Sequence, residues 1–158
     1  VAYLVFFAII FLFFLLNNIL FIPLGSIFGI HPRDFSLMSI IQIMMSWSVH
    51  GNWQHLIGNV SILIFLMFIP YFFEKHPNKI ILSLIFLSGL LTWILGSSNS
   101  VHIGASGLIF SIFGYSFSSL LINKKFIYLI PVSLLSYFYY QVIIKGLIPQ
   151  ENILFLLF

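Results

Sequence analysis

Apolar residues fill long runs of this chain, and polar residues gather in short clusters between them. The runs lie at about 1–22, 53–73, 80–96, 104–122 and 126–144, and a sixth begins near 153. A helix needs about 20 apolar residues to cross a membrane, and the first five runs approach that length. Backbone groups in lipid must be paired within the protein, which favours helices for runs this continuous. The pattern predicts an all-α polytopic membrane helix bundle with five full transmembrane helices and the start of a sixth.

Charged residues are too scarce to cover the surface of a water-soluble domain. The 158 residues include only 6 Lys and Arg and 3 Asp and Glu, and 61% are hydrophobic. In soluble domains about a quarter of the residues are charged. We therefore expect lipid to be the solvent of this chain. We expect an integral, multi-pass membrane protein with one domain over 1–158. The small, scattered net charge of +3 argues against a nucleic-acid partner.

The basic residues are divided unevenly between the two predicted sides of the membrane. The loops at 74–79 and 123–125 hold four of the six, and the other side holds Arg33 and Lys145. Cytoplasmic loops carry an excess of Lys and Arg. We therefore expect these two loops, and the start of the chain, to lie in the cytoplasm.

The long loop at 24–52 contains an apolar stretch, "DFSLMSIIQIMMSW", directly after Arg33. The stretch is too short to span a membrane. Two interpretations stay open: a short helix in the outer membrane interface, or a buried helix within the loop.

Polar side chains occur at the same depth of two predicted helices. His55 and Asn59 are four residues apart and share one face of the helix that begins near Trp53. Ser106 lies near the first turn of another helix, where backbone N–H groups lack an intrahelical partner. A hydroxyl there can attack a carbonyl while nearby donors stabilise the oxyanion. The alternatives are a packing hydrogen bond for His55 and Asn59, and a helix cap for Ser106.

Two motifs, "HGNWQHLIGN" (50–59) and "IGASGLIFSIFGY" (103–115), resemble the rhomboid family of intramembrane serine proteases. The matching residues are His50, Trp53, His55, Asn59, Gly104, Ser106, Gly107 and Gly114. The resemblance implies a rhomboid-like fold with Ser106 as the nucleophile. It gives oxyanion stabilisation to His55 and Asn59, together with the backbone N–H of Ser106. It also implies cleavage of single-span membrane proteins near the outer face, with no metal and no cofactor.

A serine nucleophile needs a base, and the chain offers no evident one. The resemblance implies a His near the outer start of the sixth segment. The sequence from Leu154 to Phe158 instead reads Leu-Phe-Leu-Leu-Phe, and no His follows His102. The chain begins and ends inside apolar runs, and we expect it to be a fragment that lacks terminal portions.

Other chemistries have weaker support from the sequence. His102, four residues before Ser106, and Lys145 are alternative bases. Zinc binding by His50, His55 and His102 would lack an acidic partner. Asp34 is the only Asp, which excludes an aspartyl dyad.

Two other functions stay open beside the protease. One is an inactive rhomboid-like pseudoprotease that binds membrane proteins. The other is a small transporter, which the scarcity of buried charge and of paired broken helices disfavours. Asn17 and Asn18, near the outer end of the first segment, are interpreted as interfacial or packing groups.

Overall fold

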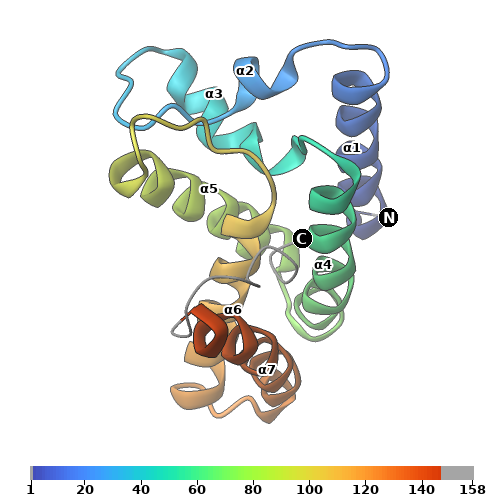
Figure 1. Cartoon of the computed structure of the whole chain (residues 1–158). Helices are drawn as coiled ribbons and strands as arrows, with labels where there is room; N and C mark the ends of the chain where they lie inside the picture. Colours follow the sequence, from blue (N-terminus) through green and yellow to red (C-terminus); the bar gives the residue numbers. More distant parts are fainter. Residues whose placement is uncertain (1, 147–158) are drawn as a thin grey trace. The chain divides into compact units, whose positions relative to one another are not determined.

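The computed structural model describes residues 2–146, so the sixth predicted segment lies outside the described residues. The described part is helical (Figure 1), and its only β-structure is an isolated antiparallel bridge between Ile30 and His102. The elements are α1 (Ala2–Asn18), α2 (Leu24–Phe28), α3 (Met38–Met45), the 3-10 helix η1 (Ser46–Ser48), α4 (Trp53–Phe73), α5 (Pro77–Leu95), α6 (Ser106–Leu121), the 3-10 helix η2 (Phe126–Tyr128) and α7 (Leu129–Gly146). The all-α prediction is confirmed.

Two of the described helices are long and apolar enough to cross a membrane. They are α4 and α5, and both lie close to the ranges predicted from the sequence. The shorter apolar helices are α1, α6 and the stretch Phe126–Tyr137. Five spanning helices therefore remain a prediction.

Several large apolar side chains of α4 and α5 are exposed, while some polar side chains of the first unit are buried. Phe65 in α4 is 66% exposed and Leu91 in α5 is 54% exposed. Asn59 in α4 is only 7% exposed, and His50 is fully buried. The core is mostly apolar, but exposed large apolar side chains together with inward polar groups suit a chain whose surroundings are lipid.

The chain forms two compact units, one of residues 1–112 and one that begins at Phe113. In the first unit α1 contacts α4 and α3 contacts α5 (Figure 1). Two aromatic pairs hold α1 in place: Phe6 stacks on Trp47 with ring centroids 4.3 Å apart, and Phe14 meets Trp53 at 4.4 Å. In the second unit the edge-to-face pair of Tyr115 and Tyr128 joins α6 to η2.

The short helix expected in the 24–52 loop is present as α3, extended by η1. Its inward face carries Ser39, Gln42 and Ile43, while Ile40 and Ile41 are exposed. Apolar residues on the outward face fit a lipid neighbourhood, and the inward face packs on α5. The five-residue helix α2 had no counterpart in the hydropathy pattern, because so short an element has no readable period.

Gly89 marks the closest approach between α3 and α5. A Cβ atom built on Gly89 would overlap the backbone carbonyl oxygen of Ile43 and would lie 3.0 Å from Ile43 Cγ2. Because the obstacle is backbone, a side chain at Gly89 must push the two helices apart. Gly58 in α4 offers a matched comparison, since a Cβ there would meet nothing within 4 Å.

We predict that Gly89→Ala lowers the free energy of unfolding by about 1–3 kcal/mol, the usual cost of overpacking. Gly58→Ala should be neutral or slightly stabilising, because alanine has the higher helix propensity. Thermal unfolding of both variants in detergent micelles measures the difference. Equal melting temperatures for the two variants would contradict the close α3–α5 contact.

Candidate active site

The first turn of α4 positions His55 and Asn59. Asn52 precedes the helix in an extended conformation, and its side-chain oxygen accepts a hydrogen bond from His55 N–H at 2.8 Å. This N-cap satisfies one of the N–H groups that have no intrahelical partner. Asn59 Nδ2 donates to the His55 carbonyl at 3.1 Å, which uses one of its two hydrogens. The second hydrogen of that amide stays available for a ligand.

Gly104 brings the start of α6 against this polar face. Its φ of +101° is one that side-chain-bearing residues rarely adopt. A Cβ atom on Gly104 would overlap the His55 imidazole and would lie 3.5 Å from Asn59 Nδ2. Gly104 N–H donates to the Ser46 carbonyl at 3.0 Å, which ties the same backbone to η1. His55, Asn59 and the "GASG" stretch therefore meet in one place.

Ser106 is the first residue of α6. The Ala105 carbonyl accepts the hydrogen bond of Ile109 N–H at 3.0 Å, so Ala105 occupies the position before the helix. The Ser106 N–H is then among the first-turn donors without an intrahelical acceptor. The Ser106 side chain is exposed, whereas Ala105 is fully buried. A reachable hydroxyl thus stands beside a free backbone donor.

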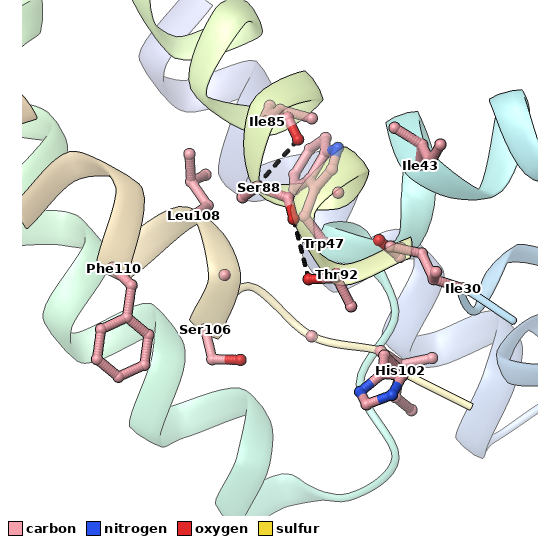
Figure 2. A pocket seen from close by; sticks show the side chains of 15 residues that line it. Ile30, Ile43, Trp47, Ile85, Ser88, Thr92, His102, Ser106, Leu108 and Phe110 are labelled. Carbon is pink, nitrogen blue, oxygen red and sulfur yellow. Dashed lines mark hydrogen bonds between the residues drawn. The ribbon is translucent and has the colours of Figure 1, made fainter. Parts of the chain in front are cut away.

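A cavity of about 270 Å³ adjoins Ser106. In Figure 2 the Ser106 hydroxyl points away from Phe110, toward the side on which His102 lies. The cavity is lined by Ile30, Ile43, Ser46, Trp47, Ile85, Ser88, Gly89, Thr92, His102, Ile103, Gly104, Ser106, Gly107, Leu108 and Phe110. His55 and Asn59 are not among these residues, so they approach Gly104 from outside the cavity.

His50 packs its ring edge-to-face on His55, with centroids 4.9 Å apart and an interplanar angle of 65°. Burial, and secondarily the nearby His55, lowers the pKa of His50 to about 4, although the Ser48 backbone acts in the opposite direction. His50 is therefore neutral near pH 7. Within the described residues neither of its ring nitrogens makes a hydrogen bond of good geometry.

The alternative chemistries find less support in the described residues. His102 lines the same cavity as Ser106, but its Nε2 lies 3.3 Å from the Ser97 carbonyl oxygen. No three His, Asp or Glu side chains within 2–146 are grouped to hold a metal, so His50, His55 and His102 do not form such a set. The side chain of Lys145 lies outside the described residues.

Several features of the site were not anticipated from the sequence. The Asn52 cap had a readable signal, an Asn directly before the apolar run. The ring contact between His50 and His55, and the Gly104 N–H bond to the Ser46 carbonyl, had none. The first depends on side-chain orientation at the start of α4, and the second joins segments that only tertiary packing brings together.

Comparison of the sequence with known protein families identifies one family. A family model, that of the Rhomboid domain, matches residues 37–156, which is more than half of the chain. The comparisons with curated proteins and with solved structures found no match. The matched region contains His55, Asn59, Gly104 and Ser106. The chain belongs to the rhomboid family of integral membrane proteins, which in general are serine proteases that act on membrane-protein substrates within the bilayer.

Proposed function

We propose that this protein is a rhomboid serine endopeptidase that cleaves single-span membrane proteins with Ser106 as its nucleophile. In this proposal residues 1–158 act as one membrane domain, and His55 and Asn59 stabilise the oxyanion. The main supporting observation concerns Gly104, which lies two residues before Ser106. Gly104 contacts His55 and lies close to Asn59. That contact brings the serine's own segment to the two side chains proposed to assist it.

The first chemical step is attack of Ser106 Oγ on a substrate carbonyl carbon. A bond forms between Oγ and that carbon, the carbonyl π pair moves to oxygen, and the hydroxyl proton passes to a base. The negative oxygen then needs donors in place before the reaction. The free hydrogen of Asn59 Nδ2, a ring N–H of His55 and the Ser106 backbone N–H are the donors we assign to it.

The general base that accepts the Ser106 proton is inferred from the family resemblance alone. The resemblance gives the role to a His at the start of the sixth segment, but no His follows His102 in the sequence, so no residue of 1–158 is assigned as the base. Collapse of the tetrahedral intermediate releases the amine, which takes the proton from that base. Water then hydrolyses the acyl-enzyme and regenerates Ser106.

The substrate must offer an extended stretch of backbone, because the carbonyls of a helix are already hydrogen-bonded. Ser106 is exposed and adjoins the cavity of about 270 Å³, which is the space where such a chain could approach. We further propose that the site opens on the outer side of the membrane. The excess of basic residues in the 74–79 and 123–125 loops supports a cytoplasmic location for those loops and for the start of the chain.

The second candidate function is a rhomboid-like pseudoprotease that binds membrane proteins without cutting them. It is favoured by one observation: no His follows His102 in the sequence. Within the described residues no hydrogen bond joins Ser106 to an imidazole. Reactivity of Ser106 toward an activated phosphorus reagent separates the two functions.

We predict that a fluorophosphonate probe labels the full-length protein in proteoliposomes and that Ser106→Ala abolishes the labelling. The reason is that only a serine with a base and an oxyanion site reacts readily with this reagent. Gel fluorescence and mass spectrometry of the labelled peptide are the measurements. Ser111→Ala, five residues further along α6, is the matched control and should label normally.

Labelling that survives Ser106→Ala would overturn the assignment of the nucleophile. A wild-type protein that stays unlabelled, while it still co-purifies with membrane proteins, would favour the pseudoprotease.

We predict that Asn59→Leu slows probe labelling by a factor of about 10²–10³, as expected when one oxyanion donor is lost. Leucine has a similar size but no N–H group. Ser61→Ala is the control, because the Ser61 hydroxyl bonds only the Ile57 carbonyl of its own helix. The measurement is the second-order rate constant of probe labelling for wild type, Asn59→Leu and Ser61→Ala. An Asn59→Leu rate within about twofold of wild type would remove Asn59 from the oxyanion site.

A further inference from the structure

The last residue of α1 reaches the segment that leads into the candidate site. Asn18 Nδ2 donates to the His50 carbonyl at 2.9 Å and to the Phe14 carbonyl at 3.2 Å. We propose that Asn18 is a positioning residue of the active site and acts on the His55 ring through His50. This inference rests on the proposed function of His55. It also extends the site to α1, which precedes the region matched by the family model.

The segment between η1 and α4 has little hydrogen bonding of its own. Val49 N–H donates to the Ser46 carbonyl at 3.3 Å, and the next backbone bond joins Leu56 to the Asn52 carbonyl at 3.0 Å. Between these points, the Asn18 amide is the partner of the His50 carbonyl. A bond from a neighbouring helix therefore fixes the His50 backbone.

The His50 side chain depends on that backbone for its position. The ring is fully buried, and neither nitrogen makes a hydrogen bond of good geometry in the described part of the chain. Packing, main-chain placement and the nearby Ser48 backbone therefore hold the ring where it is. A backbone shift at His50 moves the ring directly.

His55 contacts both His50 and Gly104. Its imidazole packs against the His50 ring, and its Nε2 and Cε1 atoms face the Gly104 backbone. These two contacts define the orientation in which a ring N–H can face the oxyanion. If His50 shifts, His55 loses one of its two supports while Ser106 and Asn59 keep their places. The expected consequence is slower reaction without weaker binding, because orientation matters most in the transition state.

Asn17 provides a matched control for Asn18. It is the adjacent residue of the same helix, it is also half-buried, and its Oδ1 accepts a hydrogen bond from Gly25 N–H at 3.1 Å. Asn17 thus anchors the start of α2, and within the described residues it makes no hydrogen bond to the His50 segment. Loss of either amide should affect α1 to a similar extent, but only Asn18 leads to His50.

The test compares Asn18→Leu with Asn17→Leu in the full-length protein, with a fluorophosphonate as the probe. We expect Asn18→Leu to lower the maximal labelling rate constant by about tenfold, with the half-saturating probe concentration unchanged. Asn17→Leu should label at the wild-type rate, and Asn18→Gln, which keeps an amide donor, should recover part of the loss. Wild-type labelling of a folded Asn18→Leu protein would overturn the inference.

A second measurement does not depend on reactivity. Ring ¹³C–¹H spectra of histidine-labelled protein should show the His50 and His55 signals displaced in Asn18→Leu and Asn18→Gln, and unmoved in Asn17→Leu. If both signals coincide with those of wild type in a folded Asn18 variant, the link from Asn18 to His55 is absent. If the wild-type protein is not labelled at Ser106, the proposed function fails, and these spectra still decide whether Asn18 positions the rings.

Discussion

The contact between the Gly104 backbone and the His55 imidazole is the constraint on which the candidate site depends. It leaves no room for a side chain at residue 104, and the φ of +101° also favours glycine. The same residue donates its N–H to the Ser46 carbonyl, so η1, α4 and the start of α6 converge at one backbone position. Ser106 follows two residues later, and its location is therefore set by Gly104.

Lipid as the solvent explains why so many polar groups lie inside the first unit. A polar side chain that faces hydrocarbon costs free energy, so Asn59 and His50 are better placed against the protein. The outward positions are left to residues such as Phe65 and Leu91. The candidate site uses this inward polar face near the beginning of two helices, where unpaired backbone N–H groups are also available.

Hydropathy and helical spacing predicted much of this arrangement. The predicted run at 53–73 matches α4, because Asn52 and Trp53 mark its start and the Glu74 cluster marks its end. The spacing of His55 and Asn59 likewise predicted a shared face. The predicted helix over 1–22 was too long, since α1 ends at Asn18. The side chains of Asn17 and Asn18 bond to distant backbone there, and a one-dimensional pattern carries no information about such contacts.

An experimental structure of the protein after reaction with a fluorophosphonate would show whether Ser106 is the nucleophile and which groups face the oxyanion. The adduct mimics the tetrahedral intermediate, and its phosphoryl oxygen stands for the oxyanion. The account predicts phosphorus bonded to Ser106 Oγ, with that oxygen accepting hydrogen bonds from Asn59 Nδ2, His55 and the Ser106 N–H. An adduct on another residue, or a phosphoryl oxygen turned away from both His55 and Asn59, would contradict it.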